Sequence, residues 1–522
     1  MLRYKLGWAA LVLCLMGNKA LAQGTVRGDL TLNTNFYRND ARLGQFGTNT
    51  THYERQLSGA EGWFFLNYNN QGFDFNVRYD FFHNSNLLNP QEAFSDQGLF
   101  FFNANKQVGN LHITIGSFYD QFGSGILFRA YEDRLIGLDF AMTGLKLQYD
   151  IKPNLRLKGF TGRQKYRFDL KPQVVMGLNL EGNFNKGKWN VSYGASTVKR
   201  TLDQKNDIEP LATKIKTDHP DYEDWFVPKY NVYGAQAYGS LSRGRFSLNV
   251  DAATKTREVI FDYDITTMNK PGYYAEAGIS YFMKGLGINL KAKRGEYFSI
   301  RTSPYTALNP IAEGQVGYLP PVNRLNSYRL AARYAPAVQE LGELGVSGDV
   351  NLKINKNNSL FFNYSDIYQP NLLNETLFRE YFGTFYHKFS SKFKATIGYQ
   401  NIYYNQKIYE GKPDGTPNVQ TNTGFLEVSY KTNKRYIRSL RFEAHYLSTE
   451  QDLGDFAFGL VELNVTRNIS LTLSDMINTA PNPATRNANV AEGEMVHYPT
   501  VFLLIVKDQT RFTAGYIKQV EG

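Results

Sequence analysis

The stretch "GSFYDQFGSGILFRAYEDR", residues 116–134, combines residue types that could act on a solute. Gly123 and Gly125 flank Ser124, which permits a sharp turn. Four charges of both signs follow closely: Arg129, Glu132, Asp133 and Arg134. If this loop folds into a pore, its charges constrict the pore and set up a field across it. If the loop is solvated outside, its ion pairs contribute little, and the sequence leaves both interpretations open.

The densest acidic cluster lies in "DHPDYEDWF", residues 218–226. Its carboxylates could bind a hard cation such as calcium: Asp218, Asp221, Glu223 and Asp224. Their spacing matches no EF-hand loop, so these are weak metal candidates and a solvated acidic loop is the commoner case. The aromatic residues beside them suit either stacking on sugars or a membrane interface: Tyr222, Trp225 and Phe226.

Enzymatic signatures are missing from the sequence. It contains no H-E-x-x-H, no G-x-S-x-G and no Walker loop, and its seven histidines are scattered. We therefore expect a protein that is not an enzyme and needs no cofactor. A barrel hydrolase remains an alternative, because such enzymes build their sites from residues on different strands.

The elements that must position these loops are strands. In "FDFNVRYDF", residues 73–81, apolar and polar residues alternate strictly, so one face of a strand is apolar and the other is charged. The same alternation recurs in "KWNVSYGAST", "RFSLNVDA", "LGINLKAK" and "SLRFEAHY". Sustained alternation of this kind predicts an all-β chain.

Short and long connections alternate along the chain. Tight joints such as "KPN" (152–154) and "SRG" (242–244) are separated by long polar stretches, among them 200–229 and 297–323. This pattern is typical of a large antiparallel transmembrane β-barrel with short periplasmic turns and long extracellular loops. We predict about 24–26 strands, a number within the range of known outer-membrane barrels. A soluble sandwich would not keep charges on one face through so many strands.

Composition agrees with a surface that is half lipid-facing and half wet. Aromatic residues make up 15% of the chain, yet the mean hydropathy is −0.42. Residues 1–22 read as a cleaved signal peptide that contains the single cysteine, Cys14. Its three basic residues account for the change in formal charge from +10 to +7 on cleavage before Gln23. The sequence contains no block of like charges that would indicate a nucleic-acid partner.

Residues 23–522 are predicted to form the barrel, located in the cell outer membrane with lipid and lipopolysaccharide around it. The leading interpretation is a channel or transport pore, closed by in-folded loops or by a partner protein, since a wide open barrel is poorly tolerated. The alternative is a structural or assembly scaffold. Charged residues predicted to face the lumen are Asp74, Arg78, Asp80, Arg156, Lys158, Glu181, Arg245, Asp251, Glu276, Lys291, Lys293, Arg441 and Glu443.

The segment "FYDQFGSGILFRAYEDR", residues 118–134, resembles a family of large Gram-negative outer-membrane β-barrel proteins that is catalogued as a domain of unknown function. The strand layout extends the resemblance over most of the mature chain. The resemblance implies a barrel in the outer membrane and implies no activity.

The C-terminus departs from the pattern expected of a closing strand. "TRFTAGYIKQVEG" offers Phe512 and Tyr516 and then becomes polar, and by alternation this strand runs outward. Either the pairing around 334–358 shifts the strand parity, or the sequence is truncated before its last hairpin arm. We expect truncation, because the terminal residues lack both the closing pattern and the closing direction.

Overall fold

The computed structural model describes residues 24–43, 52–89, 92–220, 227–261, 267–308, 313–370, 375–432, 434 and 436–519. The predicted signal peptide lies outside these residues. Within the described part, no helix has the length and apolar character needed to cross a membrane.

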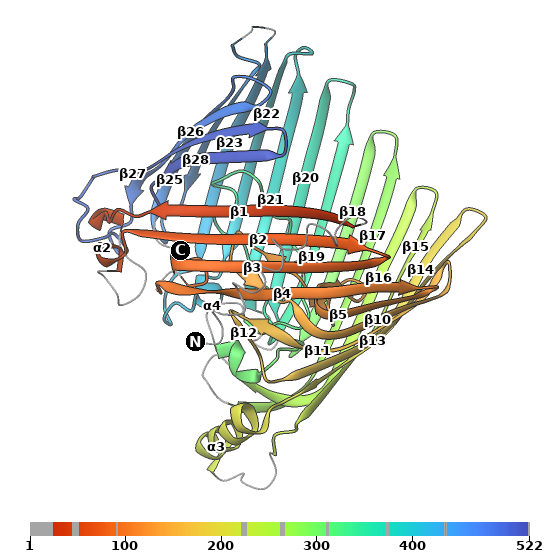
Figure 1. Ribbon diagram of the computed structural model, residues 1–522. Coiled ribbons are helices and arrows are strands. Elements are labelled where there is room, and N and C mark those ends of the chain that lie inside the picture. The colour runs from red at the N-terminus through yellow and green to blue at the C-terminus, as the bar shows by residue number, and fades with distance from the viewer. Residues whose placement is uncertain are drawn as a thin grey trace.

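Most of the described residues lie in β-strands (Figure 1). The first strands of the main sheet are β1 (Thr25–Phe36), β2 (Ser58–Asn70), β3 (Phe73–Ser85), β4 (Phe94–Val108), β5 (Leu111–Phe118), β10 (Met142–Lys152), β11 (Leu155–Tyr166), β12 (Asp169–Leu170), β13 (Val174–Lys186), β14 (Trp189–Thr201), β15 (Asn231–Arg243), β16 (Phe246–Phe261), β17 (Thr267–Met283) and β18 (Leu286–Glu296). It continues through β19 (Gly342–Lys353), β20 (Asn358–Gln369), β21 (Glu375–Lys388), β22 (Phe393–Tyr404), β23 (Val419–Lys431), β24 (Ser439–Ser448), β25 (Gly454–Asn464), β26 (Ile469–Pro481), β27 (Val496–Lys507) and β28 (Thr510–Ile517).

The remaining elements lie in connections. Four two-residue strands form two small ladders after β5: β6 (Asp120–Gln121) with β7 (Arg129–Ala130), and β8 (Glu132–Asp133) with β9 (Leu138–Asp139). The helices are η1 (Ala41–Leu43), α2 (His52–Arg55), η2 (Gln204–Ile208), α3 (Glu209–Asp218), η4 (Pro304–Leu308) and α4 (Gln406–Glu410).

All ladders of the 24-stranded sheet are antiparallel, and strands adjacent in sequence are adjacent in space. The predicted all-β fold class and strand number are confirmed. Short turns gather at one end of the strands, the turn end, and long connections at the other, the loop end. The segment 334–358 contains one ordinary hairpin between β19 and β20.

The two faces of the sheet are inverted relative to a soluble protein. In β3, Phe73, Phe75 and Val77 are exposed, whereas Arg78 and Asp80 are 2% and 1% exposed. In this strand apolar side chains lie on the outer face and charged ones on the inner face, which is the distribution that a lipid surround requires. The alternation read from residues 73–81 corresponds to this arrangement.

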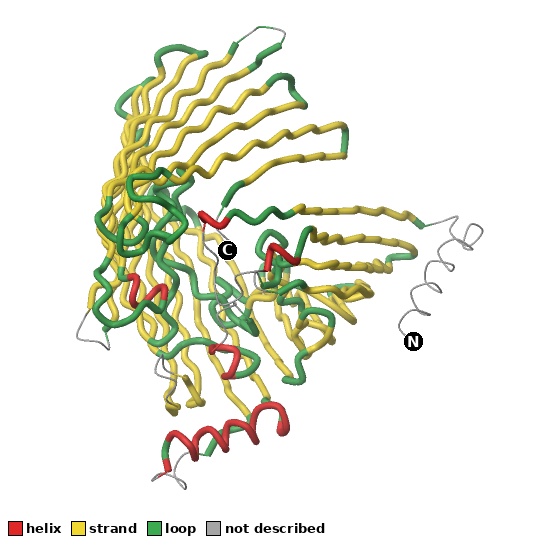
Figure 2. Tube along the Cα trace, turned by 90° about the vertical axis from the view of Figure 1, so that its left-hand side faces the viewer, coloured by secondary structure: helices red, strands yellow, loops and turns green. Residues whose placement is uncertain are grey.

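Two loop-end segments fold back against the inner face. They are the first inner loop (119–141) and the second inner loop (297–341, described except for 309–312). The sheet curves around them, and Figure 2 shows these loops between the early strands and the rest of the sheet. Buried residues of both loops and of the strands share one core cluster, which includes Leu127, Phe160 and Val316.

The first and last strands form open edges. β1 pairs with β2 and β28 with β27, and no ladder joins β1 to β28 among the described residues. Both strands run from the turn end to the loop end, and their residues are almost all exposed. At the loop end Lys518 Nζ lies 2.8 Å from Asp40 Oδ2, so the two edges meet there. The expected truncation stays a prediction.

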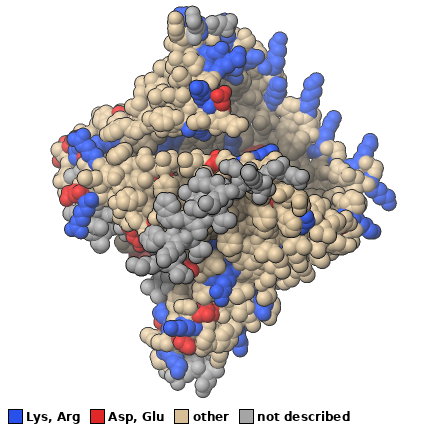
Figure 3. Space-filling model, in the orientation of Figure 1, with Lys and Arg blue, Asp and Glu red and all other residues tan. Residues whose placement is uncertain are grey.

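The turn end is strongly basic. Every short turn from β10 to β28 carries or adjoins exposed Lys or Arg side chains, which project from the turn-end edge in Figure 3. We call this set the basic rim: Lys152, Lys186, Lys188, Arg243, Arg245, Lys284, Lys353, Lys356, Lys392, Lys431, Lys434, Arg438, Arg467, Lys507 and Arg511.

Candidate functional site

The tip of the first inner loop is fixed by two glycines. Gly123 and Gly125 have φ angles of 51° and 90°, a backbone region that residues other than glycine rarely adopt. A Cβ on Gly123 would lie 2.5 Å from the ring of Tyr238 in β15. Ser124 between them hydrogen-bonds the carboxylate of Asp251 in β16. The sharp turn read from the sequence therefore places the loop tip against the inner wall.

Beyond the tip, the first inner loop is held by a cluster of buried charges, the Arg78 cluster: Arg78, Asp80, Glu132, Asp139 and Lys165. Arg78 Nε donates to Asp80 at 2.7 Å, Nη1 to Glu132 at 2.9 Å and Nη2 to Asp139 at 2.6 Å. Lys165 Nζ donates to Asp139 at 2.6 Å and to Asp80 at 3.1 Å. Two cations of the wall thus bind two carboxylates of the loop.

Asp139 accepts hydrogen bonds from both cations of the cluster, Arg78 and Lys165. Tyr119 also donates its hydroxyl to Asp139 Oδ1 at 2.9 Å. Burial alone raises the pKa of this carboxyl, but the ammonium of Lys165 and the guanidinium of Arg78 outweigh burial and lower its pKa below the ordinary value. The carboxylate is therefore charged at neutral pH and binds both cations.

The second inner loop crosses the inner face. Near its middle, Arg129 N–H donates to Val316 C=O at 2.8 Å and Tyr318 N–H donates to Gly125 C=O at 2.9 Å, so the second loop pairs with the first. Farther on, Gln400 of β22 donates to Ala331 C=O at 2.9 Å. Tyr334 donates to Asp452 at 2.8 Å. The two loops together span from β3 to β25.

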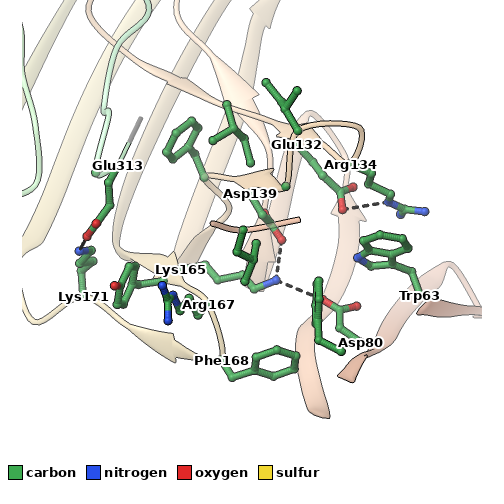
Figure 4. A pocket seen from close by; sticks show the side chains of 18 residues that line it. Trp63, Asp80, Glu132, Arg134, Asp139, Lys165, Arg167, Phe168, Lys171 and Glu313 are labelled. Atoms are coloured by element: carbon green, nitrogen blue, oxygen red, sulfur yellow. Dashed lines mark hydrogen bonds and ion pairs between the residues drawn. The ribbon is translucent and has the colours of Figure 1, made fainter. Parts of the chain in front are cut away.

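A pocket of about 110 Å³ lies beside the Arg78 cluster (Figure 4). Its aromatic lining includes Trp63, Phe82, Phe140, Tyr166 and Phe168. Its charged lining comes from wall and loop alike: Asp80, Glu132, Arg134, Asp139, Lys165, Arg167, Lys171 and Glu313. A solute in this pocket would therefore touch the groups that hold the first inner loop in place.

The four predicted constriction charges separate in the structure. Glu132 joins the Arg78 cluster, and Arg134 Nε donates to it at 2.9 Å. Arg129 instead lies over the rings of Tyr131 and Tyr318, at 4.5 and 4.6 Å. Asp133 accepts from Leu135 N–H at 3.1 Å. Their role in constriction stays a prediction.

Most predicted lumen charges point to the inner face in small groups. Lys158 lies 3.3 Å from Glu181 and 3.5 Å from Asp120. Lys293 binds Glu343 at 2.8 Å. The remaining members contact these neighbours: Asp74 binds Asn67, Arg156 binds Asp150, Asp251 binds Gln236, Lys291 binds Glu276, and Arg441 binds Glu443.

Arg245 lies just outside a strand. It is exposed in the turn between β15 and β16, one residue before β16 begins, and belongs to the basic rim. The alternation of "RFSLNVDA" includes Arg245, but β16 begins only at the next residue, Phe246. That Arg245 faces the lumen stays a prediction.

The acidic cluster is only partly described. Asp218 ends α3 and pairs with Lys214 at 2.5 Å, while Asp221, Glu223 and Asp224 lie outside the described residues. No group of three metal-ligating side chains occurs in the described part. The metal candidates stay a prediction.

Several residues of the site were not predicted from the sequence. Lys165 and its neighbour Gln164 are both buried at the end of β11, so strict alternation places Lys165 on the wrong face. Asp139 follows a turn at Gly137 and belongs to no long alternating run. In sequence, the second inner loop is read as an ordinary polar connection, because it contains no apolar run as long as a strand.

Comparison with known proteins gives the family. The model of a family of unknown function (DUF6029) matches residues 1–522. The chain belongs to this family, which confirms the resemblance read from residues 118–134. No curated protein matches the chain.

Solved structures resemble it only distantly. OpdK of Pseudomonas aeruginosa, determined with vanillate, is 11% identical with a TM-score of 0.36, covering 86% of this chain and 98% of that chain. The P pilus usher translocation pore PapC is 11% identical with a TM-score of 0.45, covering 95% and 96%. A BenF-like porin from Pseudomonas fluorescens Pf-5 is 11% identical with a TM-score of 0.35, covering 87% and 98%. Similarity this distant transfers no ligand or activity.

Proposed function

We propose that this chain is a transport pore of the cell outer membrane, closed at rest by its two inner loops. The inverted faces of the sheet support the membrane setting, because exposed apolar strands with a polar interior suit a lipid surround. In this proposal residues 1–22 are the export signal and residues 23–522 form the barrel.

The observation that carries the proposal is the Arg78 cluster. It joins wall to loop through side chains that are at most 17% exposed, with donor–acceptor distances of 2.6–3.1 Å. Buried charges whose partners are removed are costly, so the loop is held firmly while every partner stays in place. Opening the pore requires these charges to find other partners.

The pocket favours a neutral, hydroxylated solute over a free ion. Its cations are already paired with its carboxylates, for example Lys171 with Glu313 and Arg134 with Glu132. A charged solute must break such pairs, whereas hydroxyl groups use the remaining hydrogen-bonding capacity, and aromatic rings cover apolar faces.

The experiment is a planar-bilayer conductance measurement on the chain with residues 121–134 replaced by a short Gly-Ser linker. We expect a higher conductance than in the unaltered chain. The matched control shortens the exposed stretch 411–415 between α4 and β23. None of its residues belongs to the buried apolar clusters that include the inner loops. This change should therefore leave the current unchanged.

The rival function is a scaffold for assembly. A current that does not change when the first inner loop is removed, together with a protein captured by crosslinking at the loop end, would contradict the pore and favour the scaffold.

A further inference from the structure

The basic rim gathers exposed charges of one sign at one end of the described strands. The short turns that it follows contain a single acidic residue in the sequence, Asp508. No rim side chain forms an ion pair with another described residue. In Figure 3 blue side chains project along the right-hand edge, and few red ones lie among them. Like charges gathered without partners repel one another, so they call for an anionic partner.

The distribution of the rim identifies the kind of partner. Each short turn from β10 to β28 contributes, from Lys152 to Arg511, so the charge follows the perimeter of the sheet and does not form one patch. A single docked protein would contact only part of that perimeter. A lipid leaflet surrounds a barrel on its whole outer side and meets every turn.

The apolar surface next to the rim agrees with this. Outward-facing aromatic residues lie within a few positions of the turns, among them Phe184, Phe246 and Tyr430, and all three are exposed. Arg243 lies 4.7 Å from the ring centroid of Trp189 across one pair of strands. Aromatic rings at the level of lipid headgroups, with Lys and Arg just beyond them, form the usual boundary of a membrane-spanning surface.

We infer that the basic rim binds the phosphate headgroups of anionic phospholipids in the leaflet at the turn end. This inference rests on the proposed membrane setting and goes beyond the transport function. Lys ammonium and Arg guanidinium groups donate to phosphate oxygens. Each basic residue at an anionic surface contributes about a fivefold preference for that surface, and the preference weakens as salt screens the charges.

The test uses the chain in nanodiscs made from equal amounts of phosphatidylcholine and phosphatidylglycerol, with retained lipids counted by native mass spectrometry. The rim variant carries Lys186→Gln, Lys188→Gln, Arg245→Gln and Lys284→Gln. The control removes four exposed loop-end cations by Arg55→Gln, Lys205→Gln, Lys216→Gln and Lys229→Gln.

We expect the unaltered chain and the control to retain an excess of phosphatidylglycerol over the supplied ratio. In the rim variant this excess should be lower by a factor of at least about five. Retention in the supplied ratio, or equal losses in both variants, would overturn the inference. Rim-dependent sedimentation with purified peptidoglycan without phosphatidylglycerol enrichment would also overturn it. Failure of all three chains to enter nanodiscs would instead overturn the proposed membrane setting.

Discussion

At the scale of single residues, Arg78 is the centre of the site. Its three guanidinium nitrogens bind the wall carboxylate of Asp80 and the loop carboxylates of Glu132 and Asp139. The planar fork of arginine suits several carboxylates at once, which a lysine could not bind in the same way. Arg78 was predicted from the alternation of β3 to face inward, but its partners in the loop were not, because no sequence spacing relates strand β3 to residues 132–139.

Asp139→Asn is predicted to loosen the first inner loop. It leaves Arg78 and Lys165 buried with one carboxylate fewer, and breaking a buried pair in this way costs about 3–5 kcal/mol. Amide hydrogen exchange in 119–141 should become faster, and channel openings more frequent. Asp133→Asn, in the same loop but outside the Arg78 cluster, should change neither quantity. Equal effects of the two substitutions would contradict the role of the cluster.

The loop should also respond to acid. The pKa of Asp139 is lowered on folding, so its contribution to loop docking is complete above its unfolded value of about 3.9. That contribution is lost as pH falls below about 4 and through the folded pKa. Conductance should therefore stay constant between about pH 7 and pH 5 and rise only below about pH 4. A rise centred near pH 6 would point to a histidine and contradict this account.

At the scale of elements, alternation predicts strands and their faces well, and it fails where strands end. β3, β14 and β24 follow the pattern read from the sequence, whereas Arg245 falls in a turn and Lys165 breaks the alternation at the end of β11. The inner loops were harder to predict. Their apolar residues, such as Leu127 and Val316, carry no period of their own and are buried only because the sheet surrounds them.

Substitutions on the two faces of one strand should differ. Ile279 in β17 is 43% exposed on the outer face, and Ile279→Arg should cost about 2–4 kcal/mol if it lies near the bilayer midplane. The neighbouring Ser280→Arg faces inward and should be tolerated. Folding yield in lipid vesicles, read by heat-modifiable migration on gels, measures both. Equal tolerance would reverse the assignment of faces, because a shift of one residue exchanges them.

At the scale of the whole molecule, the chain is a sheet with three distinct surfaces. The outer face is apolar, the inner face carries buried charges and apolar clusters that pack against two loops, and the turn end is basic. The first of these follows from the alternation in sequence. The filled interior and the basic rim depend on how distant segments come together, and the rim is visible only after the short turns are known to share one end.

Cell fractionation should place the protein in the outer membrane. The folded chain should resist denaturation in detergent at room temperature and shift in gel migration on heating, because the long internal strands of the sheet pair on both sides. Recovery in the soluble periplasm or in the inner membrane would contradict the proposed location.

The central claim is that the two inner loops close the pore. The most direct measurement is single-channel conductance of the chain with 121–134 and 313–335 both replaced by Gly-Ser linkers, compared with the unaltered chain in the same lipid. The unaltered chain should be closed or open only briefly, and the doubly altered chain should conduct steadily with a larger current than either single replacement. A doubly altered chain that folds, as judged by heat-modifiable migration, yet conducts no more than the unaltered chain would contradict the account.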